Sequence, residues 1–413
     1  MTTAIAPDAA EMLPDYGGGS ILNLIASIGR ACGGRFLDYA RLSLVPEASF
    51  ARTQRLLLIV IDGLGDALLR EAGQGTHLAA HRVGGLTSVF PSTTAAAVTT
   101  LMTGLAPAAH GLTGWHMLFE EAGGVLAVLP LRRRAPPVAG TEAGMEAGME
   151  ADAPRAEVPP PERLFAHTGL FAGLGRASRV LSPADIAFSP FNLHHTRGAA
   201  VRGYADREDL FAQLAGLAAN GARSAAPNFT YAYYDGLDAL SHRHGAYGDA
   251  ACAELFALDA AFARLLDALA GSDTTVVVTA DHGFIDSPPE HWLDLAEFPD
   301  LAALLEQPLC GEPRVAYCYV RTGQGEAFEA AAAHCIGHAV RCVRSEALAE
   351  AGWFGPGPLH PRLKSRIGTH TLLLRDDWTL RDWLPGERRY RQYGVHGGIS
   401  KREMQVPLIV ARV

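Results

Sequence analysis

The sequence has 413 residues, of which 48% are hydrophobic and 19% charged, so the chain is long enough to bury a large core. Its formal net charge of −9 argues against binding to nucleic acid polymers or to an anionic membrane surface. No apolar run reaches the roughly 18 residues of a membrane span, and the N-terminus lacks the pattern of a secretory signal. The six cysteines are scattered without a CxxC pair, which favours free thiols and a cytoplasmic location.

Buried strands alternate with helices along the first part of the chain. Residues 55–69, RLLLIVIDGLGDALL, read as a strand that ends at Asp62 and is followed by a helix. Residues 228–245 begin with a second strand, and a long helix over about 249–270 leads into a third strand in TTVVVTADHG. This order predicts an α/β fold with a mostly parallel central sheet and helices on both faces. Polar residues just past the strands are then expected to form the site.

Two regions interrupt this pattern. Residues of about 131–165 are rich in Pro, Gly, Ala and Glu, which predicts a mobile surface insertion. Residues 287–393 contain short strands and an Ala-rich helix, which predicts a small α+β cap. A final strand over 406–410 returns to the core. We therefore expect a core domain of residues 1–286 and 394–413 that carries a cap insertion.

Five separated stretches supply three Asp, three His and a hydroxyl-rich segment. They contain Asp62, the segment VFPSTTAAAVTTLMTG (89–104), Asp238 with His242, Asp281 with His282, and His396. Asp and His are suitable ligands for zinc. Two such ions about 4 Å apart are a known device for displacement at phosphorus. The residue count fits two three-ligand sites that stay open to a substrate.

In this order the motifs resemble the alkaline phosphatase superfamily, and within it the nucleotide pyrophosphatase/phosphodiesterase family. The resemblance rests on D-G after the first strand, F-P-S-T-T, M-T-G-L-A-P-A-A-H-G, D-x-x-x-H, D-H-G and a late H-G. It covers about residues 55–118, 228–286 and 393–413. Singly each motif is weak, whereas the ordered set is specific.

The resemblance implies a role for each matching residue. Asp62, Asp281 and His282 would bind one divalent metal ion, with Thr94 as the nucleophile beside it. Asp238, His242 and His396 would bind the second ion, and zinc is the expected metal. Thr93 and Ser92 remain alternative nucleophiles.

The nucleophile segment also makes sense from its own chemistry. A threonine hydroxyl is a weak nucleophile at neutral pH and needs a metal or a base. The segment predicts a helix that opens at Thr94, where backbone N–H groups suit a phosphoryl group. Helix capping is the alternative role for Thr93 and Thr94. Nucleotide-cleaving relatives usually carry Asn three residues after the nucleophile, and here that position is Ala97.

The function expected from the sequence is hydrolysis of small phosphate esters through a covalent phospho-threonine, with phosphodiesters or nucleotide pyrophosphates preferred. A phosphomonoesterase or a phosphonate hydrolase is the alternative enzyme, and a sugar-phosphate mutase or a non-catalytic binding protein is less favoured. No Lys or Arg lies between Arg82 and Arg132, so the nucleophile segment carries no cation of its own. Arg132–Arg134 or Arg314 would supply one if they folded back onto the site. His194 and His195 either face the substrate or are loop residues. The oligomeric state is not predicted.

Overall fold

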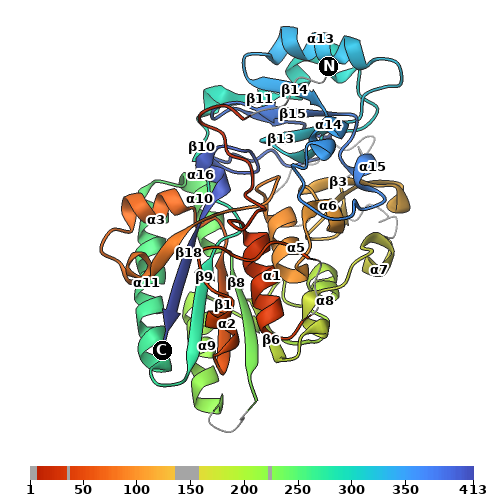
Figure 1. Cartoon of the computed structure of the whole chain (residues 1–413). Coiled ribbons are helices and arrows are strands. Elements are labelled where there is room, and N and C mark those ends of the chain that lie inside the picture. The colour runs from red at the N-terminus through yellow and green to blue at the C-terminus, as the bar shows by residue number, and fades with distance from the viewer. Residues whose placement is uncertain (1–6, 35–37, 135–157, 222–225) are drawn as a thin grey trace.

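A seven-stranded sheet forms the lower half of the computed structural model, which describes residues 7–34, 38–134, 158–221 and 226–413 (Figure 1). The strand order is β2-β18-β9-β1-β8-β6-β7. The strands are β1 (Arg55–Ile61), β2 (Arg82–Thr87), β6 (Ala177–Pro183), β7 (Ala199–Tyr204), β8 (Asn228–Tyr234), β9 (Thr274–Thr279) and β18 (Gln405–Arg412). Six of them run in one direction, and β18 runs antiparallel to both of its neighbours. The predicted mostly parallel sheet is confirmed.

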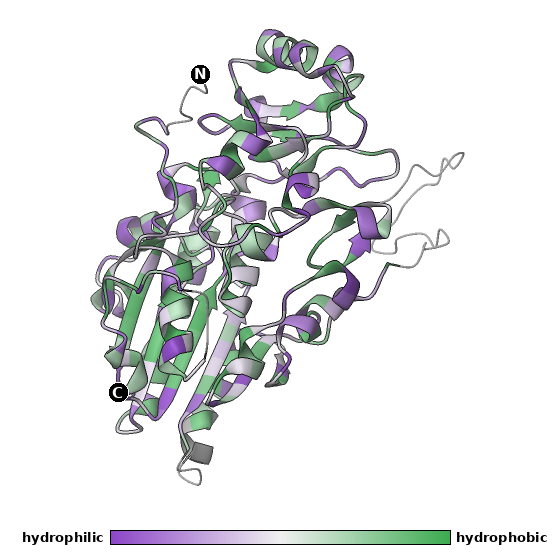
Figure 2. Cartoon of the chain, turned by 45° about the vertical axis from the view of Figure 1, so that its right-hand side comes forward, coloured by the Kyte–Doolittle hydropathy of each residue, from purple (hydrophilic) through white to green (hydrophobic). Residues whose placement is uncertain are grey.

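Continuous apolar sequence is what this sheet requires, because helices cover both of its faces. In β1, no residue from Leu56 to Ile61 exposes more than 3% of its surface. Figure 2 shows these central strands as the most hydrophobic part of the chain. The covering helices are α1 (Ile21–Ala31), α2 (Ala48–Ala51), α3 (Asp66–Ala72), α4 (His77–Ala80), α5 (Thr94–Thr103), α8 (Pro190–His195), α9 (Arg207–Gly221), α10 (Gly236–His244) and α11 (Asp249–Leu269). The predicted long helix corresponds to α11.

A second, antiparallel sheet of seven strands lies above the first in Figure 1. Its order is β14-β15-β13-β12-β3-β4-β5, and α13 (Gly325–Ile336) and α14 (Ser345–Glu350) accompany it. The strands are β3 (His116–Phe119), β4 (Gly124–Ala127), β5 (Arg132–Arg133), β12 (Cys310–Glu312), β13 (Val315–Cys318), β14 (Val340–Arg344) and β15 (His370–Leu374). Residues 116–133 therefore join the sheet of the predicted cap. Residues 135–157 of the predicted insertion lie outside the described residues.

Two structural links fix the cap region to the core. The short strands β10 (Ile285–Asp286) and β17 (Gly394–Val395) pair antiparallel, so the chain enters and leaves the cap at neighbouring points. The buried guanidinium of Arg314 donates to both carboxylate oxygens of Glu403, at 3.0 and 3.1 Å. Glu403 belongs to α16 (Lys401–Met404), directly before β18. The domain boundaries at 287 and 393 stay a prediction.

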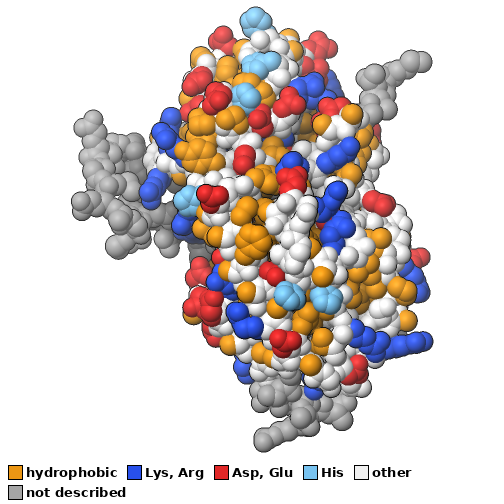
Figure 3. Space-filling model, turned by 90° about the vertical axis from the view of Figure 1, so that its left-hand side faces the viewer, with side chains coloured by type: hydrophobic (Ala, Val, Ile, Leu, Met, Phe, Trp, Pro, Cys, Tyr) orange, Lys and Arg blue, Asp and Glu red, His pale blue; other side chains and the backbone are white. Residues whose placement is uncertain are grey.

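The surface carries mixed charge on the face drawn in Figure 3, where acidic and basic side chains alternate over both halves of the molecule. Among the described helices, none is long and apolar enough to cross a membrane. That no nucleic acid polymer is bound stays a prediction from the net charge.

Candidate metal centre and nucleophile

Three adjacent strands deliver the predicted metal ligands to one edge of the main sheet. Asp62 follows β1, while Asp281 and His282 follow its neighbour β9. Asp238 and His242 lie one turn apart on α10, which begins two residues after β8, the other neighbour of β1. His396 comes directly after β17. The carboxyl ends of parallel strands meet at this edge, which is the usual position of sites in such sheets.

The first ligand group consists of Asp62, Asp281 and His282, all of them buried. The Nε2 atom of His282 lies 3.2 Å from Oδ1 of Asp62 and 3.4 Å from Oδ2 of Asp281. The other oxygen of each carboxylate is held by the protein. Oδ2 of Asp62 accepts from the Tyr233 hydroxyl, and Oδ1 of Asp281 accepts from the backbone N–H of Gly63 at 3.2 Å.

The second ligand group lies beside the first and shares His282 with it. Atoms of Asp238, His282 and His396 lie within 4.8 Å of one another. The rings of His282 and His396 stack with their centroids 3.6 Å apart. His242 joins this group because its Nε2 lies 3.4 Å from Oδ1 of Asp238. The structure therefore brings all six predicted ligands together, with His282 between the two sets.

All three histidines are oriented for metal binding by backbone carbonyl groups. Each Nδ1 atom faces a carbonyl oxygen: that of Gly394 at 2.8 Å for His242, Gly283 at 3.1 Å for His282 and Ser92 at 3.3 Å for His396. A proton on Nδ1 satisfies each contact and leaves the lone pair on Nε2 directed into the centre. This arrangement is typical of metal-ligating histidines.

Three carboxylate oxygens in this centre are buried without a hydrogen bond: Oδ1 of Asp62, Oδ1 of Asp238 and Oδ2 of Asp281. Burial, followed by repulsion from Asp281 and Asp238, raises the pKa of Asp62 well above its usual value. Burial also lowers the pKa of His396 well below its usual value, as do His282 and His242. A buried carboxylate without a partner is costly, and bound cations remove that cost. These residues fit two divalent metal ions.

Thr94 supplies the hydroxyl that faces this centre. Helix α5 begins at Thr94 as predicted, with Thr93 as its N-cap residue. The Oγ1 atom of Thr94 lies 3.1 Å from Nε2 of His282. The two alternative hydroxyls are engaged elsewhere, because Ser92 donates to the carbonyl of Gly398 at 2.7 Å and Thr93 donates to Glu312. The geometry thus favours Thr94 over both alternatives.

Glu312 is a site residue that the sequence analysis missed. It ends β12 of the second sheet, and its Oε1 accepts from Thr93 and from the backbone N–H of Trp115 at 2.7 Å. Burial raises the pKa of Glu312 to about 7, although the hydrogen bond from Thr93 opposes this shift. The cap region therefore places a carboxyl group next to the nucleophile segment. No motif in the sequence marks this residue.

The family of the chain follows from comparison with known proteins. Its sequence matches the family described as type I phosphodiesterase / nucleotide pyrophosphatase over residues 56–399, which is most of the chain. The chain belongs to this family. Members of the phosphodiesterase family act on phosphate esters with the help of metal ions, so the chain is a hydrolase of this general class. The comparison with curated proteins found no significant match.

Several solved structures share the fold of this chain. Murine ectonucleotide pyrophosphatase/phosphodiesterase 5 has a TM-score of 0.62 at 16% identity, covering 86% of this chain and 87% of that protein. The human protein of the same name gives 0.60 at 16% identity, with the same coverage. Phosphonoacetate hydrolase from Sinorhizobium meliloti 1021, in complex with phosphonoformate, has a TM-score of 0.58 at 17% identity. The match covers 86% of this chain and 89% of that protein. At these identities the likeness establishes the fold alone.

The remaining candidates from the sequence lie away from this centre. Arg134 binds Glu387 and the carbonyl groups of Leu309 and Asp382, and Arg314 binds Glu403, so neither cation folds back onto Thr94. His194 and His195 are buried on α8 in a cluster with His110, His167 and His360. They are neither loop residues nor neighbours of the metal ligands.

This buried histidine cluster predicts loss of stability in mild acid. Burial lowers the pKa of His195 to about 3 and that of His360 to about 4, against about 6.5 in an unfolded chain. The neutral histidines therefore contribute full stability above pH 6.5. Below pH 6.5, each of these histidines is expected to lower the free energy of unfolding by about 1.4 kcal/mol per pH unit, until the pH reaches its pKa in the folded protein. Urea unfolding between pH 7.5 and 5 measures this slope.

A pair of variants assigns the slope to the cluster. His195 donates from Nδ1 to the carbonyl of Phe191 at 2.8 Å, and the amide of Asn reaches a similar position without titrating. His195→Asn should reduce the slope of the unfolding free energy against pH by the contribution of about one proton, which is about 1.4 kcal/mol per pH unit. His334→Asn, at an exposed position on α13, should leave it unchanged. An unaltered slope in His195→Asn would show that His195 is not the source.

Proposed function

We propose that this chain hydrolyses phosphodiesters or nucleotide pyrophosphates with two divalent metal ions and a covalent phospho-threonine at Thr94. The observation that carries the proposal is the position of the Thr94 hydroxyl, 3.1 Å from Nε2 of His282, beside three unsatisfied buried carboxylate oxygens. A murine relative supports the role of the hydroxyl, because a threonine-to-alanine variant of that protein is described as inactive and binds AMP.

The residues divide the chemistry between them. Bound at the two ligand groups, divalent ions supply charge stabilisation at the phosphoryl oxygens and activation of the nucleophile. Asp62, Asp281 and His282 would hold the first ion, and Asp238, His242 and His396 would hold the second. Zinc is the expected metal, and other divalent metals are compatible with these ligands. Thr94 attacks phosphorus from the start of α5, whose first backbone N–H groups face an incoming anion. The attack breaks the bond from phosphorus to one ester oxygen, which takes up a proton and leaves as the alcohol, so the phosphoryl group on Thr94 keeps the second ester arm. Water then displaces the threonine oxygen, which restores the hydroxyl and releases the phosphate monoester.

A preference for diesters follows from the charge around Thr94. A monoester brings close to two negative charges at neutral pH, whereas a diester brings one. The carboxyl of Glu312 contacts the neighbouring Thr93, and residues 83–131 contain no Lys or Arg. We expect kcat/KM for bis(4-nitrophenyl) phosphate to exceed that for 4-nitrophenyl phosphate by about tenfold or more, equivalent to roughly 1.4 kcal/mol. Initial-rate kinetics on the same enzyme preparation measure this ratio.

Phosphonate hydrolysis is the second candidate function. Ala97 stands where nucleotide-cleaving relatives usually carry Asn, and the phosphonoacetate hydrolase structure matches most of this chain. Phosphonoacetate belongs in the substrate panel for this reason. If the enzyme hydrolysed phosphonoacetate but neither the nitrophenyl diester nor the nitrophenyl monoester, phosphonate hydrolysis would replace the diesterase proposal. A clear preference for the monoester would show that another cation reaches the site.

The cellular location stays a proposal as well. All six cysteines are free thiols in the structure. Free thiols suit a reducing compartment, and we propose the cytoplasm.

A further inference from the structure

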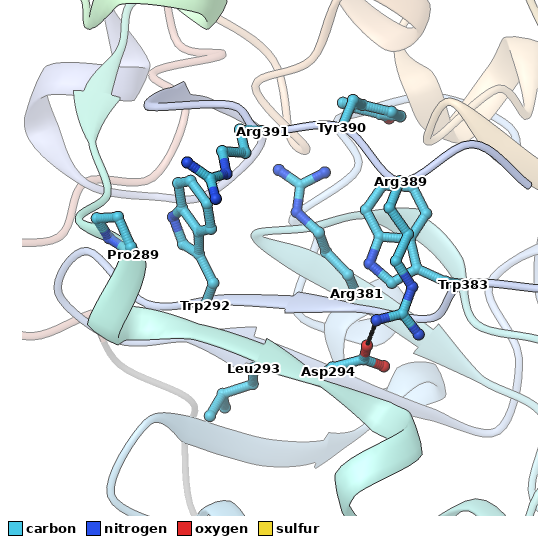
Figure 4. A pocket seen from close by; sticks show the side chains of 9 residues that line it. All are labelled: Pro289, Trp292, Leu293, Asp294, Arg381, Trp383, Arg389, Tyr390 and Arg391. Carbon is cyan, nitrogen blue, oxygen red and sulfur yellow. Dashed lines mark ion pairs between the residues drawn. The ribbon is translucent and has the colours of Figure 1, made fainter.

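An open pocket of about 310 Å³ lies between the two segments that connect the cap to the core. It has three arginines and three large aromatic rings in its walls (Figure 4). The lining residues that carry these groups are Trp292, Arg381, Trp383, Arg389, Tyr390 and Arg391. We call it the arginine pocket. Its volume is within the range of small-molecule sites.

Arg381 is the unusual member of the arginine pocket. It ends β16 (Thr379–Arg381) and exposes only 9% of its surface. Its guanidinium donates to the side-chain amide of Gln392 at 2.8 Å and lies 5.6 Å from the ring of Trp383 and 5.4 Å from that of Tyr390. Within the described part of the chain, no carboxylate lies within 4.0 Å of it. The carboxylate that acts on it from a greater distance is Glu312, which is itself bound to Thr93 and to the backbone N–H of Trp115. A buried guanidinium without a direct ion pair is costly, which points to an anion that arrives with a ligand.

The other two arginines add positive charge at the mouth of the arginine pocket. Arg389 is paired with Asp294 at 3.2 Å. Arg391 is exposed and forms no ion pair with a described residue. In Figure 4 the guanidinium groups of Arg381 and Arg391 point into the same space beside Trp292. Two cations thus remain for an anionic group, and arginine suits carboxylate and phosphoryl oxygens.

The arginine pocket adjoins the metal centre through one continuous segment. Two residues beyond Arg391, the backbone N–H of Tyr393 donates to the carbonyl of His242 at 2.9 Å. The ring of Tyr393 lies 5.6 Å from that of Trp292 in the pocket wall. His396 follows five residues after Arg391, so their Cα atoms are at most about 18 Å apart at full extension. An extended substrate spans a separation of this order.

We infer that the arginine pocket binds a second anionic group, a carboxylate or a phosphoryl group, at the far end of the substrate arm. This inference rests on the proposed diesterase function and narrows its substrate class to esters with an acidic arm. Arg381 contacts that group directly, and Arg391 completes the contact from the rim.

Matched substrates test the inference. The probes are 4-nitrophenyl phosphodiesters whose second arm is an alkyl chain of three or six methylene groups that ends in methyl, carboxylate or phosphonate. For the wild-type enzyme, kcat/KM should be about 10- to 100-fold higher for an acidic arm than for the methyl arm of equal length, the range typical of a charge-assisted hydrogen bond. The carboxylate and phosphonate arms distinguish the two sources of the anion.

Variants then assign the preference to its residues. Arg381→Met should abolish the preference, measured as the ratio of kcat/KM between acid-ended and methyl-ended diesters of equal length, and Arg381→Lys should restore part of this ratio. Arg391→Met, at the surface, should reduce it even if Arg381→Met fails to fold. Arg412→Met, at an exposed position beside the C-terminus, is the control and should behave as wild type. Cleavage of every diester without preference would overturn the inference alone, whereas no cleavage of any diester would overturn the proposed function.

Discussion

Replacing Thr94 with alanine is expected to lower kcat for bis(4-nitrophenyl) phosphate on the order of 10³-fold or more, because the variant lacks the attacking oxygen. Metal binding should remain, since the six ligands are unaltered. Thr94→Ser keeps a hydroxyl at the start of α5 and should retain measurable turnover. Steady-state kinetics together with elemental analysis separate loss of the nucleophile from loss of metal.

Thr93→Ala is the matched control for this experiment. Thr93 precedes the nucleophile and donates its hydroxyl to Glu312, away from the metal ligands. Its removal should have a much smaller effect than removal of Thr94. If Thr94→Ala were active and Thr93→Ala inactive, the nucleophile would be Thr93 and the assignment would be one residue off.

Loss of one metal ion is the second large effect expected. His396→Ala and Asp238→Ala should each reduce the metal content from about two ions per chain towards one. Even outer-shell changes weaken metal sites by about 10- to 100-fold, so loss of a ligand should weaken the second site by at least that factor. Activity should fall with it, because displacement at phosphorus uses both ions. Elemental analysis after dialysis measures the metal content.

Controls for the metal experiment come from the same chain. His334→Ala, at an exposed position on α13, should keep both ions. Chelation should abolish wild-type activity, and restoring zinc, manganese or iron in turn identifies the metal that supports turnover. Full metal content and full activity in both His396→Ala and Asp238→Ala would show that the ligand assignment is wrong.

The main sheet and the residues at its carboxyl edge could be predicted because they follow from local patterns in the sequence. Buried parallel strands read as continuous apolar runs, and the polar residues after β1 and β9 fall at the carboxyl edge of the sheet. The start of α5 at Thr94 was predicted from the threonines that open an Ala-rich stretch. The six candidate metal ligands were predicted from ordered motifs, and the structure places them together, while their binding of metal stays a prediction.

The rest depended on tertiary contacts that leave no local pattern. The direction of β18 and the pairing of β3 with β12 are set by how distant segments meet. Glu312 and Arg381 lie in short strands of the cap region without a motif, so their nearness to the site was not predictable. The sharing of His282 between both ligand groups likewise depends on the stacking of its ring on His396.

In the proposed mechanism Thr94 carries the phosphoryl group during turnover. Acid quenching during the reaction with bis(4-nitrophenyl) phosphate, followed by trypsin and mass spectrometry, tests it most directly. Residues 83–132 form one tryptic peptide, since no Lys or Arg lies between Arg82 and Arg132. We expect a nitrophenyl phosphoryl group on Thr94 of this peptide and none on the same peptide of Thr94→Ala. A label on Ser92 or Thr93, or release of nitrophenol in the first turnover with no labelled residue, would contradict this mechanism.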